Sequence, residues 1–337
     1  MHAAVVRSFD RPPRYEEFDV PQPTGKQILV DVLAAGLHPR VRSGADGTHY
    51  TSDGRLPLVP GVDGVARLAD GQRVYFVADD DAPGTMAEQA LLDPRRAVPL
   101  PEGADPVTIA AAMNPAMSSW VALRRRISFQ PGQSVLVLGA TGNAGQMAVQ
   151  IARHLGAADI VAAGRDPQRL DLLTGRGATA VVSLAGDPEQ AAERLGKAAA
   201  DVDVVIDYTW GAPTQLAMPA LLGLRAERSA PLDWIQIGSM AGPDITLPSF
   251  VLRAANLRIM GSGQGSLTAA GIVAELPSLM EQLTAGTITA DALAVPLAQV
   301  EDAWTAPAEA GRRLVLTPTA PAHSDVQRRA AAVRKEK

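Results

Sequence analysis

Cysteine is absent from the 337-residue chain, which excludes disulfides, thiolate zinc sites and thiol nucleophiles. Basic residues are not in excess either, because 31 Lys and Arg face 36 Asp and Glu, and this balance argues against nucleic acid as a partner. No apolar run is long enough to cross a bilayer, and the first residues lack the apolar core of a signal peptide. We therefore expect a cytoplasmic protein that binds neither membranes nor nucleic acid.

The chain has the composition of a globular protein and a length that favours two domains. Short β-branched runs separated by Pro and Gly indicate a β-rich region up to about residue 101. Further along, strand-like and helix-like segments alternate, as is typical of a parallel sheet with crossover helices. The expected strands are 134–138, 160–163, 180–183, 202–206, 234–237 and 257–260. The predicted fold class is α/β, with a β-rich domain and a doubly wound parallel sheet.

A turn of small residues follows the first of these strands and leads into a helix. It consists of Gly139, Ala140, Thr141, Gly142, Asn143, Ala144 and Gly145. Strand, turn and helix in this order are typical of a dinucleotide site, where Gly142 lets the backbone approach a pyrophosphate and helix amides face its charge. A tight turn without a ligand is the alternative. The surrounding pattern favours cofactor binding, so we predict contacts from residues 140–144.

The end of the second strand indicates which dinucleotide is bound. Enzymes that use NAD place a carboxylate there for the ribose hydroxyls, but this chain has Gly164 and Arg165. A guanidinium can bind a 2′-phosphate through two parallel hydrogen bonds, so NADPH is favoured over NADH. Gly164 and Arg165 are therefore candidate contacts, with Arg169 a weaker one, although Arg165 could instead be a solvated surface charge. Asp166 precedes a proline and is interpreted as a helix N-cap.

Further motifs extend the argument along nearly the whole chain. They are Ala34-Ala35-Gly36-Leu37-His38-Pro39, Val59-Pro60-Gly61-Val62-Asp63-Gly64, Asp70-Gly71-Gln72-Arg73-Val74, Ser118-Ser119-Trp120, Pro131-Gly132 through Gly145, and Gly311-Arg312-Arg313-Leu314-Val315-Leu316. In their order and spacing, the chain resembles the medium-chain dehydrogenase/reductase superfamily, specifically its zinc-free quinone oxidoreductase branch.

The resemblance implies a domain organisation. A GroES-like β-barrel catalytic domain would comprise 1–120 and 266–319, and a central Rossmann domain would comprise 121–265. Residues 320–337 are expected to form a flexible tail. The resemblance also implies a homodimer joined through the Rossmann edge strand at 257–262.

The same resemblance implies roles for individual residues. Ser118 would lie near the nicotinamide, and Gly238 and Ser239 would lie near the adjoining ribose. His38 stands at the first ligand position of the zinc-dependent branch, but Val62 stands at the second, so we predict no metal site.

Without metal or thiol, the reaction available is hydride transfer from NADPH to a small electron-poor acceptor, a quinone or an α,β-unsaturated carbonyl. The oxygen of the acceptor becomes negative and needs a donor, for which Tyr50, His49 and His38 are candidates. His49 and Tyr50 could equally belong to an ordinary exposed loop, and His38 could have a packing or cofactor role. The alternative functions are an enoyl-thioester reductase and a redox-inert NADPH-binding scaffold or regulator.

Overall fold

The computed structural model describes residues 1–49, 51–79, 82–306 and 312–318. Tyr50 and the expected tail at 320–337 lie outside the described residues. The chain divides into two compact units: Met1–Ala111 with the chain from Asp291 onward, and Ala112–Ala290.

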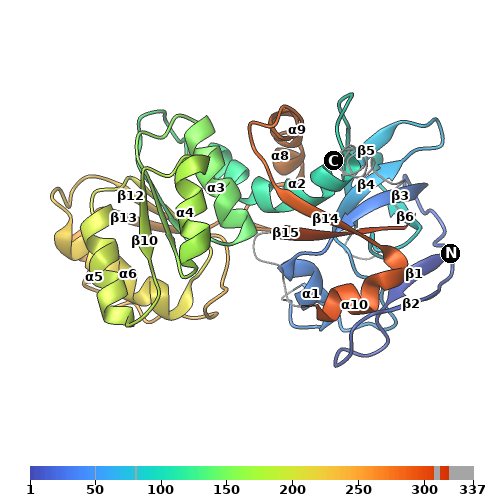
Figure 1. Ribbon diagram of the computed structural model, residues 1–337, viewed down its shortest axis with the longest axis horizontal. Coiled ribbons are helices and arrows are strands. Elements are labelled where there is room, and N and C mark those ends of the chain that lie inside the picture. Colours follow the sequence, from blue (N-terminus) through green and yellow to red (C-terminus); the bar gives the residue numbers. More distant parts are fainter. Residues whose placement is uncertain (50, 80–81, 307–311, 319–337) are drawn as a thin grey trace, which may run out of the picture. The chain divides into compact units, whose positions relative to one another are not determined.

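The first unit is mainly β-structure (Figure 1). Its strands are β1 His2–Val5, β2 Arg14–Glu17, β3 Ile28–Gly36, β4 Asp63–Arg67, β5 Arg73–Val77, β6 Gln89–Leu92, β7 Ala97–Pro99, β14 Asp291–Pro296 and β15 Arg312–Thr317. Its helices are α1 Pro39–Ala45, α10 Val300–Thr305 and the short 3-10 turns η1 Pro94–Arg96 and η3 Leu297–Gln299. The larger sheet has the strand order β14-β15-β3-β4-β5-β7, with β6 also paired to β3. All of its pairs are antiparallel except β14 with β15.

Helix α2, Pro106–Val121, carries the chain into the second unit and ends in a π-helical turn, η2 Ala122–Arg126. The strands of this unit are β8 Val135–Leu138, β9 Ile160–Gly164, β10 Ala180–Ser183, β11 Val204–Asp207, β12 Leu232–Gln236 and β13 Leu257–Gly261. Its further helices are α3 Asn143–His154, α4 Pro167–Arg176, α5 Pro188–Ala199, α6 Gly211–Leu224, α7 Val251–Ala254, α8 Ala269–Val273 and α9 Leu276–Thr284.

The sheet of the second unit is entirely parallel, with the strand order β10-β9-β8-β11-β12-β13. Strands β8 and β11 are buried along their whole length, which explains their uninterrupted apolar runs. The order reverses between β8 and β11, so the carboxyl ends of these two strands form the topological switch point of the sheet. The predicted α/β fold class with a doubly wound sheet is thus present.

The second unit extends beyond the expected 121–265. Residues 266–290 belong to it because α9 is amphipathic and buries Leu276, Leu279, Met280 and Leu283 there. Glu275, just before α9, accepts hydrogen bonds from the indole of Trp120 and from the guanidinium groups of Arg124 and Arg125. These contacts attach α9 to the end of α2 and to η2.

Candidate active site

The turn after β8 has the geometry of a phosphate-binding loop. Gly139 has φ +83°, and the Gly142 amide donates to the Gly139 carbonyl at 3.1 Å. A Cβ at Gly145 would lie 2.3 Å from the Gly139 oxygen, so only glycine lets α3 begin this close to the turn. A Cβ at Gly142 would meet only that same oxygen, at 3.4 Å. Backbone at Gly142 and the first amides of α3 can therefore approach an anion.

The end of β9 lies against this turn. A Cβ on Gly164 would meet the Thr141 side chain at 2.5 Å, so the two loops touch because residue 164 is glycine. Arg169 donates from Nη1 to the Thr141 carbonyl at 3.1 Å, and its Nε lies 3.2 Å from Asp166 Oδ2. The Asp166 carboxylate also accepts the Arg169 amide, which confirms the N-cap interpretation. Arg169 is thus engaged in holding the two loops together.

Arg165 differs from Arg169. Its side chain is exposed, and among the described residues it makes no hydrogen bond or ion pair. It follows directly after Gly164, beside the turn that carries the candidate phosphate-binding amides. A guanidinium so placed is available to a phosphate ligand.

Ser118, Gly238 and Ser239 were expected around the nicotinamide. The Ser118 hydroxyl lies 2.6 Å from the Pro115 carbonyl and 2.8 Å from the hydroxyl of Tyr208. A Cβ on Gly238 would lie 2.9 Å from the Tyr208 carbonyl oxygen. Ser239 is exposed in the same loop after β12. The structure therefore brings Ser118 and Gly238 together around Tyr208, which the sequence analysis did not single out.

Tyr208 follows β11, and Asp207 holds the loop that carries it. The buried Asp207 carboxylate accepts five hydrogen bonds. The donors are the amide and hydroxyl of Thr209, the amide of Trp210, the hydroxyl of Thr214 and the indole of Trp234. The signal in the sequence was a polar run, Asp207-Tyr208-Thr209, directly after a buried strand.

His38 belongs to a buried network in the first unit. Its Nε2 lies 2.9 Å from Asp63 Oδ1, and the Tyr75 hydroxyl donates to Asp63 Oδ2 at 2.9 Å. The exposed fractions are 3% for His38, 1% for Asp63 and 0% for Tyr75. Burial, with the nearby Asp63 charge, raises the pKa of Tyr75 well above its ordinary value, so this phenol stays neutral.

A buried cation lies close to this network. Arg313 donates from Nη1 to the carbonyl of Leu37, the residue before His38, at 3.1 Å. Burial lowers the pKa of Arg313 to about 10, while the opposite charge of Asp63 acts to raise it. The guanidinium therefore remains charged at neutral pH, and it offsets the negative charge of the buried Asp63 carboxylate.

The loop after α1 holds His49, whose Nδ1 lies 2.8 Å from the Thr51 hydroxyl. Its amide donates to the Ser43 carbonyl, which ties the loop to α1. Its side chain is half-buried rather than fully exposed. His38 and His49 both belong to the first unit, whereas the candidate cofactor contacts belong to the second.

Within the described ranges, no three His, Asp or Glu side chains come together in a group that could hold a metal ion. His38 has Asp63 beside it, and Val62 occupies the neighbouring position. The described helices include none that is both long and apolar enough to span a membrane.

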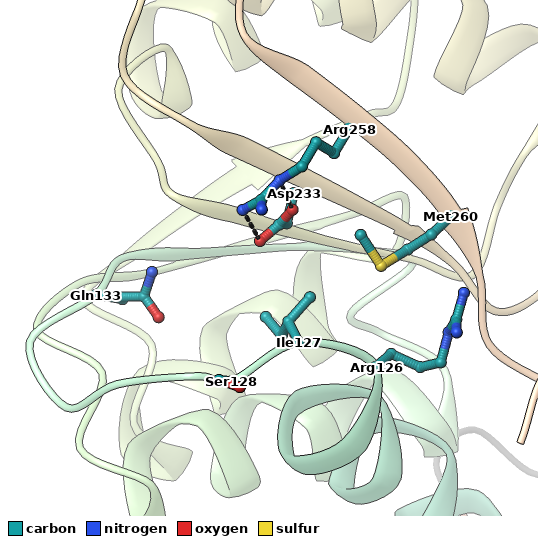
Figure 2. Close-up of a pocket in the computed structure, with 7 residues that line it drawn as sticks. All are labelled: Arg126, Ile127, Ser128, Gln133, Asp233, Arg258 and Met260. Carbon is teal, nitrogen blue, oxygen red and sulfur yellow. Dashed lines mark hydrogen bonds and ion pairs between the residues drawn. The ribbon is translucent and has the colours of Figure 1, made fainter.

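The second unit also contains a cavity of about 340 Å³, which lies away from the glycine turn. Figure 2 shows the residues that line it. Its lining residues are Arg126, Ile127, Ser128, Gln133, Asp233, Arg258 and Met260. Gln133 precedes β8, and Asp233 and Arg258 are the second residues of β12 and β13, so the cavity lies toward the amino ends of these strands. Asp233 and Arg258 are neighbours in register on β12 and β13 and form an ion pair at 2.6 Å in the lining of the cavity. Dinucleotides bind at the opposite, carboxyl ends of such sheets.

Comparison with known proteins agrees with this architecture. Residues 144–284 match the family of zinc-binding dehydrogenases. A probable NADPH-dependent quinone reductase from Emericella nidulans is 30% identical over 94% of this chain and 100% of its own length. An NADPH-dependent alkenal/one oxidoreductase from Arabidopsis thaliana is 29% identical over 47% of this chain and 45% of its own.

Solved structures agree as well. The quinone oxidoreductase of Thermus thermophilus, which was also solved in complex with NADPH, superposes with a TM-score of 0.78 at 26% identity. The superposition covers 94% of this chain and all of that one. The predicted family and two-domain fold class are therefore confirmed. The chain belongs to the medium-chain dehydrogenase/reductase superfamily, in its quinone oxidoreductase-like branch.

Proposed function

We propose that this protein is an NADPH-dependent oxidoreductase that transfers a hydride to a quinone or an α,β-unsaturated carbonyl without using a metal. The observation that carries the proposal is the exposed Arg165 at the end of β9, beside the glycine turn. A free cation there fits a 2′-phosphate, whereas NADH would call for a carboxylate. The similar proteins described as NADPH-dependent quinone and alkenal/one reductases support the same cofactor and acceptor classes.

The residues present fit a dinucleotide. The open space over Gly142 and the first amides of α3 can bind the pyrophosphate, and Arg165 can bind the 2′-phosphate. Arg169 acts indirectly, because its bond to the Thr141 carbonyl stabilises the turn. NADPH, when bound, supplies the hydride, and the protein supplies orientation and charge stabilisation. Thr141, Asn143, Ala144, Gly164, Gly238 and Ser239 are proposed backbone or side-chain contacts.

His38, His49 and Tyr50 are the proposed donors to the acceptor oxygen. His38 has the best-defined geometry, because Asp63 engages Nε2 and leaves Nδ1 without a hydrogen-bond partner among the described residues. In single-turnover experiments at saturating NADPH and acceptor, we expect His38→Asn, His49→Ala and Tyr50→Phe each to slow hydride transfer modestly. A triple variant with the parent rate would remove all three from the chemistry.

The Arg165→Ala variant tests the choice of cofactor. We expect NADPH to bind about 10- to 100-fold more weakly, because a charged hydrogen bond contributes about 1.5 to 3 kcal/mol, while the NADH affinity stays within about twofold. Arg228→Ala is a matched control, since Arg228 is also exposed but precedes β12 at the amino end of the sheet. Equal weakening of both cofactors in Arg165→Ala would contradict the assignment.

The acceptor class is tested by NADPH oxidation with a panel of quinones, enones and enoyl thioesters. Turnover with quinones or enones supports the proposal, whereas turnover confined to enoyl thioesters would make the protein an enoyl-thioester reductase. Binding of NADPH without oxidation by any acceptor would indicate a redox-inert scaffold. These outcomes are separable because cofactor binding and turnover are measured independently.

We also propose that the protein is cytoplasmic. We further propose that it forms a homodimer joined through β13. β13 is the last strand in the order of its sheet, and among the described residues only β12 pairs with it. An open edge of this kind can pair with a second copy. Sedimentation at micromolar concentration should give a dimer, and a monomer would contradict the proposal.

A further inference from the structure

Tyr208 stands at the point where a dinucleotide crosses the sheet. It is the first residue after β11, and β11 lies beside β8 at the reversal of strand order. In such sheets one half of the dinucleotide lies over each side of the reversal. Since Arg165 after β9 marks the side of the adenosine phosphate, the side of β11 and β12 is left for the nicotinamide half.

Three separate segments converge on Tyr208: the turn after β8, the loop after β12 and helix α2. A Cβ added to Gly139, after β8, would lie 3.3 Å from the Tyr208 Cβ, and one added to Gly238, after β12, would lie 2.9 Å from its carbonyl oxygen. The Met240 amide donates to that same carbonyl at 3.3 Å. Ser118 of α2 meets the phenol at 2.8 Å. The position of this side chain is therefore defined by the same segments that form the candidate cofactor site.

The protons in this pair can be assigned. The Ser118 hydroxyl donates to the Pro115 carbonyl at 2.6 Å, so its oxygen is left as an acceptor toward Tyr208. Tyr208 then donates its only proton to Ser118. Burial raises the pKa of Tyr208 to about 12, so the phenol keeps its proton at physiological pH. What remains on its oxygen is the capacity to accept a hydrogen bond.

The loop that carries Tyr208 is under backbone strain. Trp210 has φ +49° and ψ −161°, outside the left-handed minimum and in a region that bulky residues rarely adopt. Two of the hydrogen bonds to Asp207 come from the Trp210 amide and from the Thr209 amide, so the carboxylate holds the strained turn in place. Strain of this kind persists where the surrounding contacts require one position of the chain.

We propose that the Tyr208 hydroxyl oxygen accepts a hydrogen bond from the carboxamide N–H of the bound nicotinamide, and that Ser118 and Asp207 position it for this. The proposal rests on the proposed function, because it requires NADPH as the ligand. The carboxamide is the N–H donor of the nicotinamide end, and it matches the acceptor that the proton assignment leaves on Tyr208.

The test compares two cofactors in binding titrations of the whole protein. One is NADPH, and the other is its acetylpyridine analogue, in which a methyl ketone replaces the carboxamide and removes the N–H donors. We expect Tyr208→Phe to weaken NADPH binding about three- to tenfold, as for one neutral hydrogen bond, and to leave binding of the analogue within about twofold. An equal loss for both cofactors, or no loss for either, would overturn the proposal.

A second variant keeps the test decisive if Tyr208→Phe does not fold. Ser118→Ala leaves the phenol in place but removes the oxygen that orients it, so NADPH binding should again weaken more than binding of the analogue. If instead the analogue is affected as much as NADPH, the pair has a packing role only. Failure of the unaltered protein to bind NADPH at all would refute the proposed function itself, which separates the two conclusions.

Discussion

Each of the two units contains one buried carboxylate next to its candidate site. Asp63 begins β4 in the first unit, and Asp207 ends β11 in the second. Their exposed fractions are 1% and 0%, so both depend on protein donors rather than on water. Asp63 is bonded by two ionisable side chains, His38 and Tyr75. Asp207 is bonded by amides, threonine hydroxyls and an indole, which do not ionise at physiological pH.

The difference concerns what each carboxylate can do. Amide and indole N–H groups can only donate, so the geometry around Asp207 is fixed as long as its carboxylate accepts. A histidine ring can change tautomer and a phenol can rotate its hydroxyl, so the partners of Asp63 can rearrange their protons. Asp207 is therefore suited to holding a loop, and Asp63 is suited to orienting a group that exchanges a proton.

The largest expected effect comes from replacing each carboxylate by its amide. Asp207→Asn puts an NH₂ group opposite either the two backbone amides or the Trp234 indole, and these N–H donors cannot reverse, so we expect the free energy of unfolding to fall by about 2 to 4 kcal/mol. In Asp63→Asn the hydrogen bonds should cost only about 1 kcal/mol, because His38 and Tyr75 can reorient, and any further loss measures the unbalanced charge of the buried Arg313. Urea unfolding of both variants measures the difference. Equal losses would mean that the donor chemistry around the two groups does not matter.

Much of the fold of the second unit could be predicted because its central strands β8, β9 and β11 are buried on both faces. The expected strands 134–138 and 160–163 differ from β8 and β9 by a single residue at one end. The helical pattern of residues 268–283 would suggest one helix, but the chain forms α8 and α9, separated at Ala274 and Glu275 with Pro277 in the first turn of α9. In the first unit only a β-rich region could be predicted, and short strands such as β4 and β14 could not be located because they carry little alternation.

The candidate site was less accessible to sequence reasoning. The glycine turn and Arg165 are local features, and both could be named from adjacent residues. Asp63 pairs with His38 across 25 positions, and Tyr208 meets Ser118 across 90. These pairs depend on which strands are neighbours and on where α2 lies, which no local pattern encodes. Among the donors to Asp207, only the Trp234 indole is distant, at 27 positions, because Thr209, Trp210 and Thr214 lie within seven residues of the carboxylate.

An intermediate effect is expected at alkaline pH, where the phenols of the two units can be compared. The pKa of Tyr208 is raised to about 12, and that of Tyr75 well above its ordinary value of 10.0, in both cases mainly by burial. A raised pKa in the folded state contributes stability below the unfolded pKa, and this contribution is lost as the pH rises through the folded pKa. For Tyr208 the loss amounts to about 2 to 3 kcal/mol between pH 10 and pH 12.

The measurement is the free energy of unfolding as a function of pH for the parent, Tyr208→Phe and Tyr75→Phe. Each variant should lose part of the alkaline decline, and in Tyr208→Phe the missing part should lie between pH 10 and pH 12. Tyr15→Phe is a matched control with a smaller expected change, since Tyr15 is only half-buried. A decline that is identical in the parent and in both variants would mean that neither buried phenol titrates with unfolding.

The smallest expected effect, no change at all, is that of removing metal ions. Within the described part of the two networks, Asp63 and His38 are the pair that combines a carboxylate with an imidazole, and a metal ion there would compete with their hydrogen bond. Both side chains are already bonded to each other, a catalytic zinc ion needs about three protein ligands, and Val62 provides none.

We therefore expect exhaustive chelation to change neither NADPH-dependent turnover nor the free energy of unfolding, and elemental analysis to find no stoichiometric zinc. Addition of zinc after chelation is the control, and it should leave the rate unchanged. If chelation abolished turnover and zinc restored it, His38 and Asp63 would have to separate in the active protein. Asp63 would then not orient a proton-exchanging group, and the contrast with Asp207, which holds a loop, would no longer describe the two units.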